Sequence, residues 1–166
     1  MKLRMRSLVI TLASASMLLG VFLYADDDQN GQRLDGSFAV SVVPDGFGGA
    51  TFPGLVTYTP TGGAMAVELV PTPGLDAGED HGGWVRTGHN QYNITFIKMA
   101  TVHGTNTFAG YIKSRAAVTA SGDTFTGQFR IDFLSPGSDP NSVGSPATKI
   151  ATGFVQGNRI KVQPIP

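Results

Sequence analysis

Apolar and polar residues alternate over short distances through most of this chain. From residue 34 onward, stretches rich in Val, Ile, Thr, Phe and Tyr are separated by clusters of Gly, Pro, Asp and Asn, and no window holds apolar residues at helical spacing. In 124–134, Phe125, Phe129 and Phe133 fall on one face of an extended strand, opposite Thr, Gln and Arg side chains. The pattern predicts an all-β domain.

Eight strands are predicted, and most of the connections between them are short. The predicted strands are 34–43, 54–59, 64–70, 83–87, 92–102, 107–120, 124–134 and 147–162. Short connections favour antiparallel pairing of strands that are consecutive in the chain. We therefore predict an eight-stranded antiparallel up-and-down barrel, because closure removes the exposed edges of a flat sheet. A β-sandwich is the alternative, although it would need longer crossover connections.

The first 25 residues have the composition of a targeting segment. Lys2, Arg4 and Arg6 precede an uncharged apolar run over 7–24, which is typical of a signal peptide. This segment is either cleaved after Ala25 or retained as an anchor, since about 18 apolar residues is the lower limit for a spanning helix. We expect a secreted or periplasmic protein with no membrane association beyond the export signal.

The remaining chain divides into two parts. Residues 26–33 are polar and begin with three consecutive Asp residues, so we expect a flexible acidic leader. Residues 34–166 carry the strand pattern and form the predicted barrel domain, which is long enough to bury a core.

Composition excludes several kinds of chemistry. The chain has no cysteine, which rules out disulfides, a thiol nucleophile and a zinc–thiolate site. It holds 12 Lys and Arg and 12 Asp and Glu, and because three of the basic residues lie in the targeting segment, the mature part has a net charge of −3. Its basic residues are scattered, so no nucleic-acid partner is expected. No motif indicates a cofactor.

The stretch from Glu79 to Phe96 concentrates the unusual residues. His81 and His89 flank Trp84, the single tryptophan, and an acidic segment over 76–80 precedes them. Imidazole and carboxylate groups suit metal binding or acid–base chemistry, but their spacing matches no zinc signature. We expect the acidic segment to be a mobile, solvated loop, and we expect no metal site.

This stretch also resembles a known group of proteins. The run from Asp80 to Gly88, followed by Tyr92, Ile94 and Phe96, is similar to the bacterial lipocalin-like (calycin-type) β-barrel proteins, a largely uncharacterised group. The resemblance spans most of the mature chain and implies the same barrel. It also implies that Trp84 and Arg159 form a packed structural pair that closes one end of the barrel.

Aromatic residues on the predicted strands are the candidate ligand contacts. If they face inward, they line a pocket for a small apolar molecule or fill a solid core. Tyr111 and Arg115 share a side whose orientation depends on the register, and an inward arginine would hold a ligand carboxylate. The candidate binding residues are Trp84, Phe96, Phe108, Tyr111, Arg115, Phe125, Phe129 and Phe133.

The leading hypothesis is an exported barrel that binds a small apolar ligand in its interior. A second hypothesis is a barrel cyclase or isomerase of the allene-oxide-cyclase type, which rests on fold analogy and requires a polar residue inside the barrel. The third is a structural exported module with no ligand, which a solid interior would favour. No catalytic residue is identified by the sequence.

Overall fold

The computed structural model describes residues 33–68 and 72–165. In this part of the chain there are nine β-strands and no helix. The strands are β1 (Gly36–Pro44), β2 (Phe52–Tyr58), β3 (Gly63–Glu68), β4 (Leu75–Ala77), β5 (Asp80–Gly88), β6 (Gln91–Val102), β7 (Phe108–Ser121), β8 (Thr124–Leu134) and β9 (Thr148–Arg159). The predicted signal peptide 1–25 and the leader as far as residue 32 lie outside the described residues.

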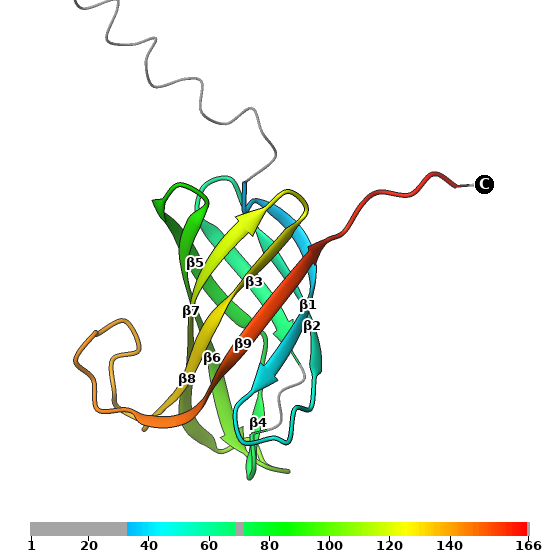
Figure 1. Cartoon of the computed structure of the whole chain (residues 1–166). Coiled ribbons are helices and arrows are strands. Elements are labelled where there is room, and N and C mark those ends of the chain that lie inside the picture. The colour runs from blue at the N-terminus through cyan, green and yellow to red at the C-terminus, as the bar shows by residue number, and fades with distance from the viewer. Residues whose placement is uncertain (1–32, 69–71, 166) are drawn as a thin grey trace, which may run out of the picture. The chain divides into compact units, whose positions relative to one another are not determined.

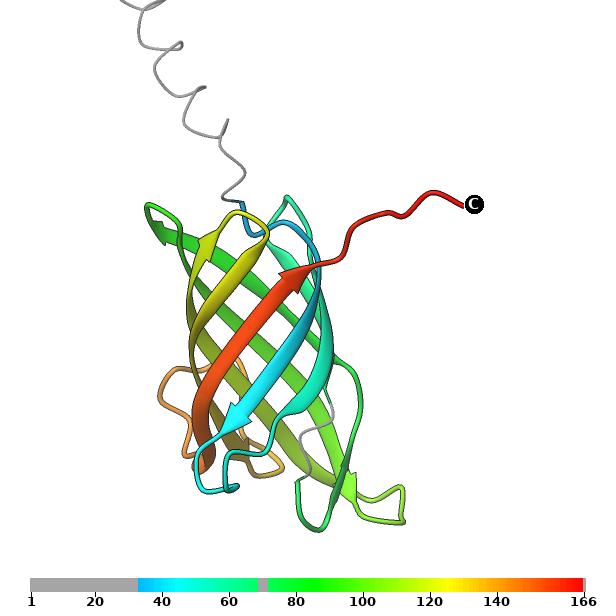
Figure 2. The same cartoon turned by 45° about the vertical axis from the view of Figure 1, so that its right-hand side comes forward.

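Eight of the described strands form a closed antiparallel barrel (Figure 1). Each pairs with its neighbour along the chain, and β9 pairs with β1 to complete the circle. The short β4 pairs with the end of β6 instead of joining the barrel. Figure 2 shows the strands running obliquely across the barrel, as closure requires. The predicted up-and-down barrel is confirmed, and the sandwich alternative is wrong.

The hairpins turn at residues that accept a positive φ. Asn90 connects β5 to β6 with φ of 60°, and Gly122 connects β7 to β8 with φ of 59°. Asn and Gly tolerate this conformation better than other residues, so the chain can reverse within two residues. These turns lie at the upper end of the barrel in Figure 1, from which the C-terminal tail also leaves.

Alternate residues of every long strand point into the barrel, where they form two apolar clusters. The first contains Leu34, Phe38, Val56, Tyr58, Ala64, Tyr92, Ile94, Val118, Ala120 and Phe125. The second contains Val42, Ala100, Ile112, Phe129, Ile131 and Ala151. The period of two in the sequence predicted this inward face on β8 correctly.

Two glycines of β9 lie where neighbouring strands pack closely. A Cβ placed on Gly157 would overlap the ring of Phe125, and one on Gly153 would overlap the backbone of Val43. Neither glycine has a positive φ. They are therefore small so that neighbouring groups can approach closely.

The predicted loop between the strands 64–70 and 83–87 is partly strand. β4 begins at Leu75, and β5 begins at Asp80, three residues earlier than predicted. Asp80 pairs with Ala66 of β3 and is 2% exposed. The expectation that this carboxylate lies in a mobile, solvated loop is wrong, because pairing with β3 draws it into the barrel wall.

Candidate functional site

A cavity of about 60 Å³ lies within the barrel. Its wall comes from all the long strands, and the lining is mostly Val, Ile, Ala and Phe. Residues of this lining with apolar side chains on the inward face are Val40, Val42, Val56, Ala66, Ile94, Phe96, Ala116, Val118, Phe125, Phe129, Ile131 and Val155. Polar groups are also present at the wall, and they decide what the cavity can bind.

Asp80 and Lys98 form a buried ion pair at this cavity. The Nζ atom of Lys98 lies 3.1 Å from Oδ2 of Asp80, and the two side chains are 6% and 3% exposed. The register of β5 and β6 places these residues opposite each other, because His81 pairs with Ile97. A charge is expensive to bury without a partner, so the pair explains how both groups remain inside the barrel.

The two members of the pair have different positions relative to the cavity. Asp80 belongs to its lining, whereas Lys98 is not among the described lining residues. The ammonium group therefore balances the carboxylate from outside the cavity wall. Asp80 is thus a buried, ion-paired residue beside the cavity.

Ser114 supplies a second polar group. It lines the cavity from β7, and its Oγ is buried with no hydrogen-bond partner among the described residues. A hydroxyl can both donate and accept a hydrogen bond. Leaving this hydroxyl without a partner costs free energy.

Tyr58 provides a third polar side chain at the wall. It is 3% exposed and packs against Phe38, Phe96 and Phe125. Burial raises the pKa of the phenol well above its usual range, because the phenolate would lose its hydration. Tyr58 is therefore neutral wherever the protein is folded.

The predicted binding residues divide between the inside and the outside of the barrel. Phe96, Phe125 and Phe129 line the cavity together. Phe133 packs against the second apolar cluster and is not among the described lining residues. Their role as ligand contacts stays a prediction.

Phe108 and Tyr111 do not face the interior. Phe108 is 41% exposed and packs edge to face against Tyr111, with 5.2 Å between ring centroids. The register between β6 and β7 shifts at Ala100 and Thr101. This bulge changes which side chains point inward at the start of β7, and sequence alternation did not reveal it.

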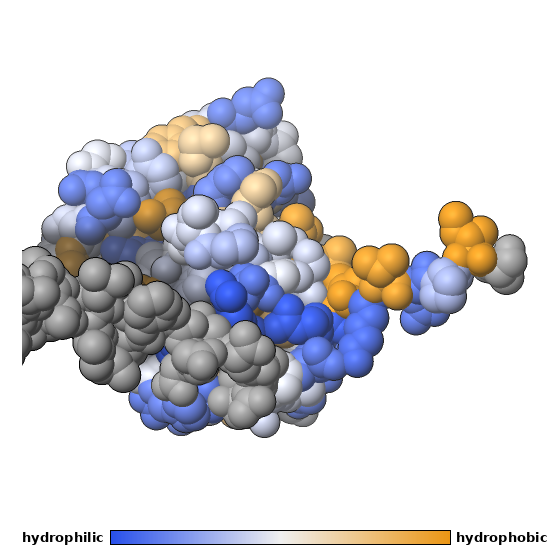
Figure 3. All heavy atoms as spheres, turned by 90° about the horizontal axis from the view of Figure 1, so that it is seen from above, coloured by the Kyte–Doolittle hydropathy of each residue, from blue (hydrophilic) through white to orange (hydrophobic). Residues whose placement is uncertain are grey.

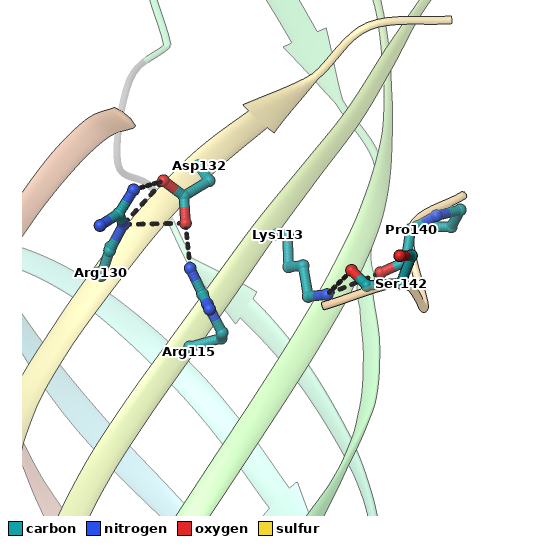
Figure 4. Close-up of polar contacts among 6 residues, drawn as sticks. All are labelled: Lys113, Arg115, Arg130, Asp132, Pro140 and Ser142. Carbon is teal, nitrogen blue, oxygen red and sulfur yellow. Dashed lines mark hydrogen bonds and ion pairs between the residues drawn. The ribbon is translucent and has the colours of Figure 1, made fainter. Parts of the chain in front are cut away.

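The side chain of Arg115 also points away from the interior, although Arg115 is among the residues that line the cavity. Its guanidinium donates to Asp132 Oδ2 at 2.5 Å, and Arg130 Nε donates to Oδ1 at 2.8 Å (Figure 4). The Asp132 side chain is 1% exposed between these arginines. The idea that Arg115 holds a ligand carboxylate inside the barrel is wrong, because Asp132 occupies its guanidinium outside.

The pKa of Asp132 reflects opposing effects. Burial is the largest single influence and raises it, but hydrogen bonds from Arg130 and Arg115, together with their charges, outweigh burial and hold the pKa below its usual value. Lys113 of the same wall donates to the carbonyl oxygens of Pro140 and Ser142 at 2.8 and 3.3 Å. It thereby holds the β8–β9 loop against the outside of the barrel (Figure 4).

Trp84 and Arg159 make separate contacts near the upper end. Arg159 lies over Phe38, 4.7 Å from the ring centroid, and donates to the carbonyl oxygens of Asp35 and Arg33. The half-buried Trp84 packs edge to face on Tyr92, and its Nε1 donates to the Thr59 carbonyl at 3.0 Å. Instead of the pair of Trp84 and Arg159 that the resemblance implies, Arg159 contacts Phe38 and Trp84 contacts Tyr92.

The histidines do not gather into a site. His81 and His89 are exposed, and Asp76 binds His103 and the backbone N–H of Gly104. The Gly104 bond, followed by the His103 bond, lowers the pKa of Asp76. Within residues 33–68 and 72–165, no three His, Asp or Glu side chains come together as metal ligands would.

Sequence reasoning missed Asp80 and Lys98 as site residues. Alternation on β6 places Lys98 on the face of Ile94, Phe96 and Ala100, and a lysine on an otherwise apolar inward face was the available signal. Its partner could not be identified because the start of β5 was placed too late.

Comparison of the chain with protein-family models, with curated proteins and with solved structures finds no match. Among the described residues, there is also no helix with the length and apolar character needed to cross a membrane.

Proposed function

We propose that this protein is an exported lipocalin-like barrel that binds a small, mainly apolar molecule in its interior. The observation that carries the proposal is the cavity of about 60 Å³ with a mostly apolar wall. The lipocalin-like assignment is further supported by the closed up-and-down barrel. Export is supported by the basic and apolar character of residues 1–25.

An unfilled cavity is unfavourable in a close-packed protein. At ~24 cal/mol per Å³, a cavity of this size costs about 1.5 kcal/mol. A molecule that fills it restores the lost van der Waals contacts. This gain favours the bound state over the empty barrel.

The size of the cavity limits the ligand. Its volume corresponds to roughly two water molecules at ~30 Å³ each, far below the ~300 Å³ of sites for drug-sized molecules. The proposed ligand therefore has few heavy atoms, unless partly buried side chains such as Phe96 move to enlarge the space.

A titration with a small apolar probe tests the proposal. Protein with ¹³C-labelled methyl groups would be titrated with xenon while NMR shifts are recorded. Saturable shifts are expected for Val40, Ile94 and Val118, which line the cavity, and none for Val143, which is 94% exposed. Linear shifts of the same size at the methyl groups of all four residues would contradict interior binding.

Two leucine variants of β7 provide matched controls. Ala116 lines the cavity, whereas the adjacent Ala117 is exposed on the outside. Ala116→Leu should fill the space and abolish the saturable shifts, while Ala117→Leu should leave them unchanged. Equal binding by both variants would place the probe elsewhere.

A barrel isomerase is the second candidate, and the buried pair of Asp80 and Lys98 favours it. A buried carboxylate beside a mainly apolar cavity suits abstraction of a proton next to a carbonyl group. The test is hydrogen–deuterium exchange at C3 of 2-butanone, followed by NMR. Exchange no faster than in buffer would eliminate this candidate, and failure of both tests would leave the structural module.

A further inference from the structure

A groove of about 820 Å³ lies on the outer wall of the barrel, across β6, β7, β8 and β9. Its outward-facing lining residues form two neighbouring rows. Strand pairing aligns the first row, which is Asn93, Ala117, Gln128 and Phe154, and the second row, which is Thr95, Arg115, Arg130 and Thr152. The rows lie two residues apart on each strand, or about 6.6 Å, so one small molecule can touch both.

The second row presents two arginines that are fixed in place. The side chains of Arg115 and Arg130 line the groove and are 44% and 49% exposed. The buried Asp132 binds Nη2 of Arg115 and both Nε and Nη2 of Arg130 (Figure 4). In the described part of the chain, the Nη1 atom of each arginine has no hydrogen-bond partner. Donors that are held in this way lose little entropy when a ligand binds.

The charges of this row favour a ligand with a single negative charge. Two arginines and Asp132 together leave one positive charge, which a carboxylate balances while matching the planar guanidinium fork. Asp45 lies at the end of the groove, where Thr152 Oγ1 donates to its Oδ2 at 2.7 Å. Its negative charge disfavours a phosphate ester, which carries about −1.5 to −2 at neutral pH.

The first row offers contacts for hydroxyl groups. The side-chain amides of Asn93 and Gln128 line the groove, are exposed, and have no hydrogen-bond partner among the described residues. Each amide has two donor protons and an acceptor oxygen, so it can bond to a hydroxyl in either direction. Ala117 lies between them and leaves room for a ligand. Phe154 is 45% exposed at the end of this row, where its ring can pack on the C–H groups of a ligand.

We propose that this outer groove binds a small, hydroxyl-rich molecule with one carboxylate, the class of the sugar acids. Arg115 and Arg130 bind the carboxylate, and the amides of Asn93 and Gln128 bind hydroxyls. Asp132 acts as a positioning residue, which holds the two like charges side by side. The groove lies outside the barrel, so this site goes beyond the proposed interior binding and does not depend on it.

Four small probes test this selectivity. The full chain with ¹³C-labelled alanine methyl groups would be titrated with methyl glucuronide, methyl glucoside, cyclohexanecarboxylate and glucose 6-phosphate. Saturable NMR shifts are expected for Ala117 in the groove and none for Ala64, which belongs to the interior core. Methyl glucuronide should bind about three- to tenfold more tightly than the uncharged glucoside, because exposed charge-assisted hydrogen bonds add modestly to affinity. It should also bind more tightly than the other two probes.

Two pairs of variants assign the preference to the named groups. Arg130→Gln should reduce the preference for the glucuronide over the glucoside. Lys161→Gln removes the same charge outside the described groove lining and should leave that preference unchanged. Gln128→Ala should reduce the advantage of the glucuronide over cyclohexanecarboxylate. Its control is Gln156→Ala, which removes an exposed amide of β9 outside the described groove lining.

Thermal unfolding of each variant would be measured first, and the exposed Gln128 keeps the test informative if Arg130→Gln is poorly folded. Equal affinities for methyl glucuronide and methyl glucoside would overturn the proposal, as would tighter binding of glucose 6-phosphate. Equal effects of Arg130→Gln and Lys161→Gln would overturn it too, because they would indicate attraction by net charge alone. Saturable shifts absent from Ala117, or present only at Ala64, would contradict a site in the groove. The xenon titration is independent of these outcomes, so the two proposals fail separately.

Discussion

Asp132 is a buried carboxylate of the outer wall that holds two arginines together. Arg115 and Arg130 pair directly across β7 and β8, and like charges in that position repel each other. Asp132 lies between them and accepts hydrogen bonds from both. Its carboxylate thus converts an unfavourable cross-strand pair into a favourable cluster.

Replacing this carboxylate should weaken the barrel at neutral pH. Asp132→Asn is expected to lower the free energy of unfolding by about 1 to 3 kcal/mol, as measured by urea denaturation at pH 7. The double variant Asp132→Asn, Arg130→Gln should regain part of the loss because the repulsion is reduced. Additive losses in the double variant would contradict this account.

The lowered pKa of Asp132 also predicts how the free energy of unfolding changes at acid pH. The pKa of Asp132 is lowered in the folded state, so its contribution to stability is present above the unfolded pKa of about 4 and is lost as pH falls through the lower folded value. Unfolding free energy measured from pH 5 to pH 2 should therefore fall less steeply in Asp132→Asn than in the unmodified protein.

Trp84 is expected to stabilise the upper end of the barrel. It packs on Tyr92 and donates to the Thr59 carbonyl, but it is half-buried, so Trp84→Ala should cost about 2 to 3 kcal/mol, less than the full loss for a buried tryptophan. His81 is exposed, and His81→Ala should leave the melting temperature unchanged. The melting temperatures of both variants would be measured by thermal denaturation. A larger decrease for His81→Ala than for Trp84→Ala would contradict this prediction.

Gly157 has a steric role that a single methyl group can test. A Cβ at this position would overlap the Phe125 ring, and the aromatic ring is fixed among Phe38 and Tyr58. Gly157→Ala should lower the free energy of unfolding by about 1 to 3 kcal/mol through overpacking. At Gly144 an added Cβ meets no atom within 4 Å, so Gly144→Ala is the matched control and should be near neutral.

At the scale of elements, β3 and β5 share the fewest residue pairs of any two neighbouring strands in the described barrel wall. It holds four residue pairs, whereas β7 and β8 share eleven. Fewer ladder hydrogen bonds mean that local opening requires less free energy. Hydrogen exchange followed by mass spectrometry should show faster exchange in 63–68 than in 111–121, and the opposite order would contradict this prediction.

Strand boundaries and register also explain why the sequence misplaced Phe108 and missed Asp80 as site residues. The bulge between β6 and β7 turns Phe108 outward. The early start of β5 brings Asp80 to Lys98. Both depend on the register of neighbouring strands, and a one-residue shift exchanges the two faces of a strand.

At the scale of the whole molecule, β9 makes the barrel a closed structure. It pairs with β1 on one side and with β8 on the other. Without it, both strands would present unpaired edges. A chain that ends at Leu134 should therefore show no cooperative thermal transition and should aggregate.

The residues beyond β9 provide the control for this truncation. Val162 and Ile165 are at least 95% exposed, and the tail leaves the barrel as Figure 3 shows from the upper end. A chain that ends at Lys161 should keep the melting temperature of the full chain. Equal stability of both truncated chains would mean that closure contributes little.

The sequence by itself determined the fold class and much of the inward face. Alternation with a period of two, together with Gly, Pro and Asn at the turns, is a local property, so it was sufficient to predict eight consecutive antiparallel strands and the inward positions of Phe125 and Phe129. The presence of an aromatic interior followed from the same pattern.

Only the tertiary structure decided which polar groups lie inside. Pairing of β5 with β3 and β6 brought Asp80 opposite Lys98, and closure placed the Ser114 hydroxyl at the same cavity. It also directed Arg115 outward to Asp132 and Arg159 onto Phe38. The physical reason is that register, bulges and the burial of charge depend on strands far apart in the chain, whereas alternation depends only on neighbouring residues.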